Sequence, residues 1–172
     1  PRLFARFKMR FDPMFPRIAD FVKPDWTIID VGCGYGVPAA WLSTLYPDLE
    51  FIACDPASER ARIAARVLGE KARVLPVGAL DLSLDPAQAN AALLLDVLHH
   101  LQDKEIAELL ARLRAALAPQ GRLIIRLTVP GPSFNFFRFV EERRLRLRGA
   151  RPHWRSEQQV IEMMGKAGFE VE

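Results

Sequence analysis

The sequence contains little that would place it across a membrane. None of its apolar runs approaches the roughly 18 residues that a membrane-spanning helix needs, and no secretory signal with an apolar core is visible. Cysteine is also scarce, because only Cys33 and Cys54 occur, and they form no C-x-x-C pair. Such cysteines favour small buried thiols over a disulfide or a metal site. We therefore predict a cytoplasmic protein.

Length and composition indicate a single globular domain. A chain of 172 residues can bury a sizeable core, and with 50% hydrophobic residues disorder is not expected. The net charge is +3, with the basic excess in two flanks, Arg2–Arg17 and Arg138–Arg155. The chain begins at Pro1 without a Met and stops at Glu172 where another strand is expected to begin. We therefore expect it to be a fragment of a longer protein.

One stretch, TIIDVGCGYG at Thr27–Gly36, joins a predicted buried strand to a glycine-rich turn. Its glycines recur at alternate positions, Gly32, Gly34 and Gly36. A Cβ at these positions would block the close approach of a ligand or forbid the backbone angles of the turn. A strand that runs into such a turn and then into a helix typically cradles a nucleotide.

The same stretch excludes two common nucleotide sites. A P-loop needs a lysine, but no Lys or Arg occurs between Asp25 and Pro47, which also disfavours a triphosphate ligand. A dinucleotide fingerprint needs a third glycine where Val37 stands. A ligand with an adenosine and a less charged tail fits better.

Several motifs resemble those of class I methyltransferases that depend on S-adenosyl-L-methionine (SAM). DVGCGYG, from Asp30, resembles the first motif of that family. LDVLHHL at Leu95–Leu101 resembles its fourth motif, and APQGRL at Ala118–Leu123 resembles the turn before its fifth strand. GKAGF at Gly165–Phe169 resembles the step into its sixth strand. The resemblance covers most of the chain and implies a SAM-dependent methyltransferase.

Strand and helix patterns alternate along the chain, which predicts an α/β fold. We expect a doubly wound, mainly parallel sheet with helices on both faces, a Rossmann-like methyltransferase fold without its C-terminal strand. Strands are predicted at Thr27–Val31, Glu50–Cys54, Ala72–Val77, Ala91–Leu95 and Arg122–Val129, with a further one from Phe169. Helices are predicted at Val37–Tyr46, Pro56–Leu68, Asp103–Leu117 and from Ser156 to near Gly168.

The two basic flanks are also predicted to be helical. The first would be one or two short helices in Arg2–Val22, interrupted at Asp12-Pro13 and at Pro16, and the second would span Ser133–Arg148. We predict that residues 1–24 form a helical or lid segment and that residues 25–172 form the SAM-binding domain.

Asp55 is the clearest candidate for binding the cofactor. It ends the second predicted strand, where a carboxylate can accept hydrogen bonds from both hydroxyls of a ribose. It could also cap the following helix, and the two roles are compatible. The resemblance extends the predicted SAM site to a larger set: Asp30, Gly32, Cys33, Gly34, Gly36, Asp55, Pro56, Gly78, Ala79, Leu80, Asp81, Asp96 and Val97.

One departure from the family concerns adenine. The family usually has an acidic residue after the glycine that follows strand three, but Ala79 follows Gly78 here. Asp81 or backbone atoms would then contact the adenine.

Asp96, His99 and His100 are the candidate catalytic residues. Methyl transfer needs a base only if the acceptor must lose a proton, and the sequence does not select among the three. A structural role for each histidine stays open. We expect no metal site, because adjacent histidines point in different directions and no acidic or cysteine cluster completes a set of ligands.

The flanks suggest the nature of the acceptor. Phenylalanines follow strand five at Phe134, Phe136, Phe137 and Phe139, and others lie near the N-terminus. They predict a small hydrophobic or lipid-like acceptor, and the neighbouring arginines allow a solvated face, phosphate recognition or peripheral membrane contact. RNA is a second possibility, disfavoured because Lys is scarce in the basic segments and no RNA-binding domain is appended.

Two functions of other classes compete with methyl transfer. The first is a non-catalytic SAM-fold module, the soluble part of a larger, membrane-associated protein. The intact glycine turn and Asp55 oppose it, because a degenerate site need not keep them. A NAD-dependent dehydrogenase is the second, and Val37 opposes it.

Overall fold

The computed structural model describes residues 12–127, 139, 142–143 and 152–172, and the chain divides into two compact units. The first unit comprises residues 1–95 and 115–125, and the second comprises residues 96–114 and 126–172. Most of the predicted helices in the basic flanks lies outside the described residues. The predicted boundary between a lid and a SAM-binding domain after residue 24 stays a prediction.

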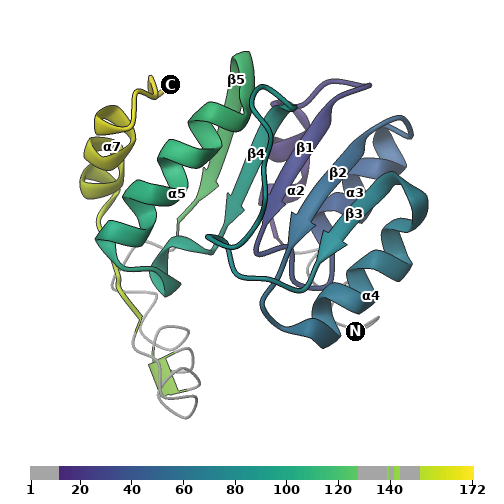
Figure 1. Ribbon diagram of the computed structural model, residues 1–172, viewed down its shortest axis with the longest axis horizontal. Coiled ribbons are helices and arrows are strands. Elements are labelled where there is room, and N and C mark those ends of the chain that lie inside the picture. The colour runs from purple at the N-terminus through teal and green to yellow at the C-terminus, as the bar shows by residue number, and fades with distance from the viewer. Residues whose placement is uncertain (1–11, 128–138, 140–141, 144–151) are drawn as a thin grey trace. The chain divides into compact units, whose positions relative to one another are not determined.

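A five-stranded sheet forms the centre of the first unit (Figure 1). Its strands are β1 (Thr27–Val31), β2 (Glu50–Cys54), β3 (Ala72–Leu75), β4 (Ala89–Leu95) and β5 (Leu117–Arg126), in the spatial order β3-β2-β1-β4-β5. The pairs β1–β2, β1–β4 and β2–β3 are parallel, and the arrows of β4 and β5 point the same way in Figure 1. The predicted fold class, an open parallel sheet of the Rossmann-like methyltransferase type, is confirmed.

The strand order reverses beside β1, because the chain moves outward to β2 and β3 and then returns to β4 on the other side of β1. Val31, the last residue of β1, pairs with Cys54 of β2 and with Leu94 of β4. The carboxyl ends of these strands are therefore level. Open α/β sheets bind their ligands at this edge, beside the strand where the order reverses.

Three helices of the first unit pack in series along the chain. They are α2 (Met14–Ala19), α3 (Val37–Leu45) and α4 (Ser58–Leu68), and α3 contacts both of the others. Phe15 of α2 lies edge-on against Trp41 of α3, with ring centroids 5.4 Å apart. Both Phe15 and Ile18 are buried, so α2 belongs to the core of this unit.

Pro16 lies inside α2, so the predicted interruption at Pro16 is wrong. The helix tolerates it because Pro16 stands in the first turn, where the missing N–H has no intrahelical partner. Other helix boundaries also shift slightly. The structure ends α3 at Leu45 rather than Tyr46, and it begins α4 at Ser58, with Ala57 as the N-cap.

The strands differ from prediction most at β5. The predicted turn at Pro119–Gly121 lies inside this strand, which already begins at Leu117. The backbone still bends there, because Gln120 has a φ of 64°. A Cβ on Gly121 would lie 2.9 Å from the carbonyl oxygen of Ala118, so the bend needs a glycine. The predictions for β1 and β2 are confirmed residue by residue, whereas β3 ends at Leu75 and β4 begins at Ala89.

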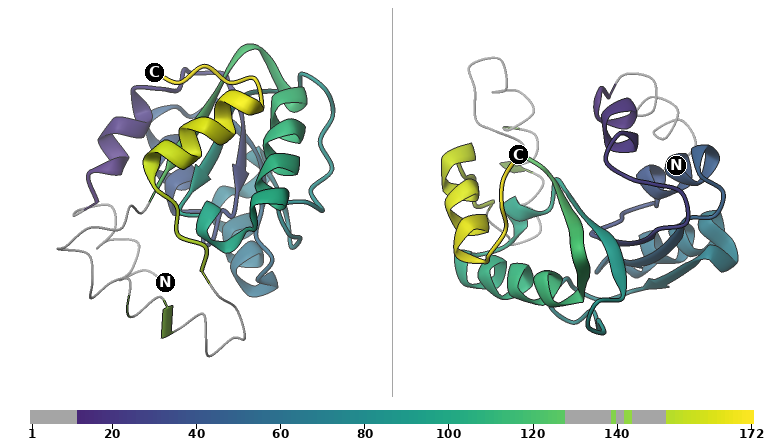
Figure 2. Two further views of the ribbon diagram at one scale, coloured as in Figure 1. Left: turned by 90° about the vertical axis from the view of Figure 1, so that its left-hand side faces the viewer. Right: turned by 90° about the horizontal axis from the view of Figure 1, so that it is seen from above.

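The second unit contains a short 3₁₀ turn, η2 (Leu98–His100), and the helices α5 (Asp103–Ala116) and α7 (Glu157–Lys166). The last residues of α5 belong to the first unit. α5 and α7 run close to each other in the views of Figures 1 and 2. The predicted apolar face of α5 is confirmed, since Ile106, Leu109, Leu110 and Leu113 are all buried.

The predicted capping box of α7 is also confirmed. The Ser156 hydroxyl accepts from the Gln159 backbone N–H, and the Gln159 side chain accepts from the Ser156 N–H. The predicted strand from Phe169 is not formed in the structure. No helix within the described ranges combines the length and apolar character needed to cross a bilayer.

Candidate functional site

The glycine turn after β1 has the geometry that its sequence predicts. Gly32, Gly34 and Gly36 all have positive φ, at 71°, 57° and 72°. A Cβ on Gly36 would lie 3.1 Å from the Cβ of Ala64, so this glycine lets α3 begin against α4. A Cβ on Gly34 would meet no atom of the described residues within 4 Å. Gly34 therefore leaves open space beside the backbone, where a ligand can approach.

Asp55 holds this turn in place. Its Oδ2 accepts from the Gly34 backbone N–H at 3.0 Å, and its Oδ1 accepts from the Ala57 N–H at 2.9 Å. Arg60 of α4 adds an ion pair, with Nη1 3.8 Å from Oδ2. The residue is only 3% exposed. Asp55 thus joins the glycine turn to the start of α4. Ala57, and not Asp55, is the N-cap of that helix, but Asp55 binds its N–H. The sequence position suggested this contact with the helix and did not reveal the contact with Gly34.

The two cysteines lie beside this site as buried free thiols. Burial is the main reason that the pKa of Cys33 lies far above its usual range and that the pKa of Cys54 rises to about 11, and the charge of Asp30 adds to both. Asp30 itself is 1% exposed. Both thiols therefore stay protonated at neutral pH, as expected of small core side chains.

The loop after β3 places another carboxylate near β2. The Asp81 N–H donates to the Gly78 carbonyl at 3.1 Å, and a Cβ on Gly78 would lie 3.0 Å from Asp81 Oδ2. The charge of Asp81 also contributes to the raised pKa of Cys54, so its side chain lies toward the end of β2. Ala79 and Leu80, inside this loop, are half-buried, and Pro56 is exposed. The first unit thus brings Asp81 toward the strand end that carries Asp55.

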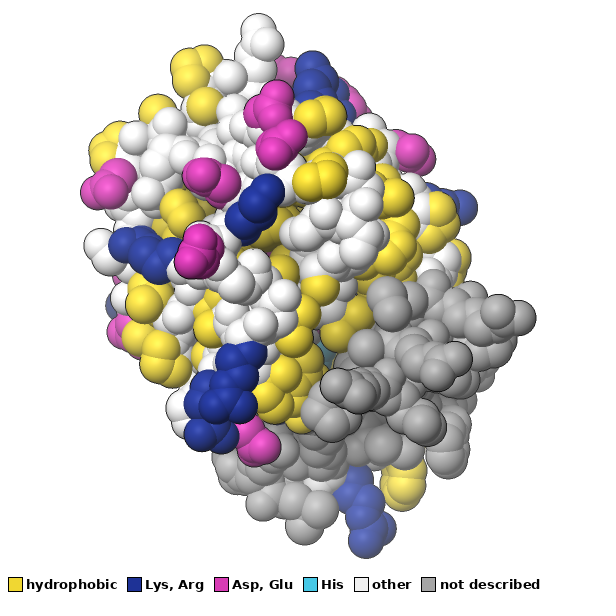
Figure 3. Space-filling model, turned by 90° about the vertical axis from the view of Figure 1, so that its right-hand side faces the viewer, with side chains coloured by type: hydrophobic (Ala, Val, Ile, Leu, Met, Phe, Trp, Pro, Cys, Tyr) yellow, Lys and Arg dark blue, Asp and Glu magenta, His cyan; other side chains and the backbone are white. Residues whose placement is uncertain are grey.

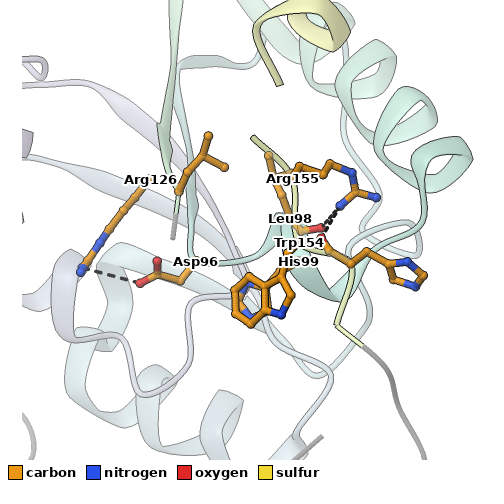
Figure 4. A pocket seen from close by; sticks show the side chains of 8 residues that line it. Asp96, Leu98, His99, Arg126, Trp154 and Arg155 are labelled. Atoms are coloured by element: carbon orange, nitrogen blue, oxygen red, sulfur yellow. Dashed lines mark hydrogen bonds and ion pairs between the residues drawn. The ribbon is translucent and has the colours of Figure 1, made fainter. Parts of the chain in front are cut away.

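A hollow in the second unit contains two of the predicted catalytic residues (Figure 4). It is lined by Asp96, Leu98, His99, Arg126, Leu127, His153, Trp154 and Arg155. Asp96 has a φ of 59°, unusual for a residue with a side chain. Its carboxylate points toward Arg126 in Figure 4, with Oδ2 3.6 Å from Nη1, and its N–H donates to the Arg126 carbonyl. Asp96 is therefore held as a partner of Arg126.

His99 is stacked in this hollow. Its ring lies 5.0 Å from that of Trp154 at an interplanar angle of 14°. Burial, with smaller contributions from His100 and Arg155, lowers the pKa of His99 to about 4. Its imidazole is therefore neutral at pH 7. The neighbouring His100 is exposed, and Val97 is buried. Within the described residues there is no group of three or more His, Cys, Asp or Glu that could hold a metal ion.

A family model described as a methyltransferase domain matches residues 29–123, which is more than half of the chain. The chain belongs to the methyltransferase domain family. The matched range contains the glycine turn, Asp55 and His99. A search of curated protein sequences found no match for this methyltransferase domain.

Solved structures agree with this assignment at the level of the fold. A SAM-dependent methyltransferase of Methanosarcina mazei has a TM-score of 0.74 and 18% identity, over 92% of this chain and 86% of its own. The cyclopropane synthase MmaA2 of Mycobacterium tuberculosis has a TM-score of 0.69 and 20% identity, over 87% and 56%. Human N-acetylserotonin methyltransferase, solved with SAM, has a TM-score of 0.70 and 18% identity, over 97% and 49%.

The methyltransferase domain spans about half the length of several of these structures. Together, the family match and the shared fold confirm the predicted resemblance to class I SAM-dependent methyltransferases.

Sequence reasoning missed most of the residues that line the hollow, including Arg126, His153, Trp154 and Arg155. Arg155 is the last residue of the basic flank Arg138–Arg155, in which no cation was predicted to be buried, and it is only 8% exposed. The sequence offered one sign that Arg155 has a structural role. It stands directly before Ser156, the N-cap of α7, where the capping box fixes the path of the chain. The individual roles predicted for the site residues of the methyltransferase domain stay predictions.

The lowered pKa of His99 predicts how stability depends on pH. In the unfolded chain a histidine titrates near pH 6.5, whereas the folded His99 titrates near pH 4. Between these values only the unfolded state binds the proton, so the free energy of unfolding falls as the pH drops. We expect His99→Gln to lose less stability than the wild type between about pH 7 and pH 4.5, measured as urea midpoints. Equal losses in both proteins would contradict a buried, neutral His99.

Proposed function

We propose that this chain is a SAM-dependent methyltransferase that transfers a methyl group to a small, hydrophobic acceptor. The observation that carries the proposal is the open space at Gly34 beside the carboxylate of Asp55. Family membership and the shared fold support it. This chain spans about half the length of several related structures. Whether it is active on its own must therefore be tested.

The residues of the first unit suit SAM as the cofactor. The turn carries no basic side chain, which fits a ligand without phosphates. Asp55 uses each carboxylate oxygen for one backbone N–H, and each oxygen has a further lone pair for a ribose hydroxyl. Asp30, Cys33 and the glycines would surround the rest of the cofactor, with Gly78–Asp81 facing the adenine. SAM supplies a methyl group on a positively charged sulfur.

We infer that His99 is the proton acceptor among the three candidates. Its pKa near 4 makes the imidazole a weak base, but the acceptor hydroxyl becomes strongly acidic as its oxygen gains the methyl group, so the neutral imidazole can take the proton at that stage. The positive charge would then pass from the sulfonium to the imidazole, so the total charge is conserved. Asp96 is already paired with Arg126, and His100 is exposed, which leaves both less suited to this step.

A hydrophobic acceptor and peripheral membrane contact are the finer parts of the proposal. They rest on phenylalanines and arginines of the flanks, nearly all of which lie outside the described residues. On the face drawn in Figure 3, Lys and Arg side chains stand among acidic and apolar ones rather than gathering in a field of one charge. Binding to anionic vesicles at low salt would support membrane contact, and its absence would contradict it.

The test compares two glycines at which a positive φ disfavours alanine. Gly34 and Gly69 have φ values of 57° and 65°, and a Cβ at either would meet no atom within 4 Å in the part of the chain that the structure describes. Only Gly34 lies in the proposed site. We expect calorimetric titration to show SAM binding by the wild type and by Gly69→Ala, and at least about tenfold weaker binding by Gly34→Ala, because the methyl group fills the ligand's space.

The outcome separates methyl transfer from its main alternative. SAM binding that Gly34→Ala leaves unchanged would refute the proposed cofactor site. Absence of SAM binding by the wild type would favour a non-catalytic module. NADH serves as a negative control, since the chain lacks the glycine that a dinucleotide turn needs.

A further inference from the structure

Arg155 is buried in a way that its neighbours in the sequence did not suggest. Among the buried polar and charged residues in the part of the chain that the structure describes, it is the only cation. Burying a guanidinium is costly unless its N–H groups all find acceptors. Arg155 donates five hydrogen bonds, and their acceptors show what it holds together.

The guanidinium encloses the η2 turn from both sides. Its Nη1 donates to the Leu98 carbonyl at 2.8 Å, and its Nη2 donates to the Leu101 carbonyl at 2.8 Å. These carbonyls stand directly before and directly after His99 and His100. Nε and Nη2 also bind Asp103 Oδ1, at 2.9 Å and 2.7 Å, which fixes the first turn of α5 to the same group.

The residues just before Arg155 contact His99 itself. The His153 N–H donates to the His99 carbonyl at 2.8 Å, and Trp154 stacks on the His99 ring. His153 in turn gives its carbonyl to Arg155 Nη1 at 2.9 Å. The segment His153–Arg155 thus contacts His99 at both its backbone and its ring. It also binds the carbonyls on either side of the two histidines.

We propose that Arg155 is a positioning residue for His99, and that Trp154 sets the plane of the His99 imidazole. The role in catalysis rests on the proposed function, in which His99 takes a proton from the acceptor. Asp96, Arg126 and His153 line the same hollow, and Asp103 balances the guanidinium charge.

The decisive measurement is an NMR titration of the His99 imidazole, because it reports on the ring itself and needs no substrate. The test variants are Arg155→Lys, which keeps the charge but cannot reach all of these acceptors at once, and Trp154→Leu, which removes the stacked ring. In both, we expect the His99 titration to move up from about pH 4 toward the ordinary value of 6.5. Trp154→Phe keeps an aromatic face and should retain the low value.

A second measurement addresses the reaction. With SAM and 2-naphthol as an apolar probe acceptor, we expect Arg155→Lys to lower kcat by at least about tenfold, while the Kd for SAM changes by less than about twofold. Arg73→Lys, which alters a surface contact to Ser83 in the first unit, is the control and should behave as the wild type.

The outcomes distinguish the two proposals. If both test variants fold and His99 still titrates near pH 4, the positioning role is refuted, whether or not the chain transfers methyl groups. If His99 shifts while the wild type neither binds SAM nor methylates the probe, the contacts hold His99 as inferred but the proposed function fails. Should Arg155→Lys not fold, the comparison of Trp154→Leu with Trp154→Phe decides the matter.

Discussion

Asp55→Asn is expected to weaken SAM binding by about 10- to 100-fold. The substitution places an amide NH₂ where a carboxylate oxygen now accepts from the N–H of Gly34 or Ala57, so one donor would face another donor. It also removes the charge opposite Arg60. A hydrogen bond to a charged group contributes about 1.5–3 kcal/mol, which corresponds to the expected range. Calorimetric titration with SAM measures the effect.

Glu59→Gln provides the matched control for Asp55→Asn. Glu59 is also a carboxylate near the start of α4, but it is exposed, whereas Asp55 is buried. Its substitution should change SAM affinity by less than about twofold, because exposed charges contribute little. If Asp55→Asn bound SAM as tightly as Glu59→Gln, Asp55 would neither hold the glycine turn for the ligand nor contact the ribose.

Arg155→Met is expected to have the largest effect on stability, lowering the free energy of unfolding by about 3 kcal/mol. The variant keeps an apolar stem but leaves the carbonyls of Leu98, Leu101 and His153 without this donor. Each buried polar group that loses its partner costs about 1–3 kcal/mol, and rearrangement or water offsets part of the total. Urea unfolding, followed by tryptophan fluorescence, measures the loss.

Asp103→Asn distinguishes the contribution of the Arg155–Asp103 ion pair to stability from that of the hydrogen bonds to the carbonyls. The side chain of Asp103 is 76% exposed, so its charge is largely screened although it lies 2.7 Å from Arg155. We expect a cost below about 1 kcal/mol. Comparable losses in Asp103→Asn and Arg155→Met would mean that the ion pair, and not the carbonyl contacts, stabilises this region.

The parts of the fold that sequence predicts best are those fixed by local pattern. Thr27–Val31 and Glu50–Cys54 are short β-prone segments, each followed by a residue that ends a strand, so their bounds follow directly. Leu117 was predicted to be the last residue of a helix, because it continues the apolar face of Asp103–Leu117. In the structure it is instead the first residue of β5, the strand beside β4. Pairing between segments that are distant in the sequence can override local secondary-structure propensity, and the local sequence does not show where such pairing occurs.

In the candidate site too, some features could be predicted from local pattern and others could not. The glycine turn and Asp55 were predicted because a ligand needs those residue types at that spacing. The bonds from Asp55 to Gly34 and Ala57 follow from the folded path of the chain and are not encoded in any motif. Arg155 was hidden because a basic flank gives no local sign of which cation becomes buried, and its partners at Leu98 and Leu101 are far from it in sequence.

The contacts of Arg155 also bear on how such a domain can change its chemistry. Around the two histidines, the guanidinium donates to the main-chain oxygens of Leu98, Leu101 and His153. These bonds do not involve the side chains of the η2 turn. These contacts therefore hold the turn whichever side chain stands at position 100, whereas the ring of His99 itself stacks on Trp154. Mutation can exchange the exposed side chain at position 100 while the turn keeps its shape, which makes this position a suitable place to select for new acceptors.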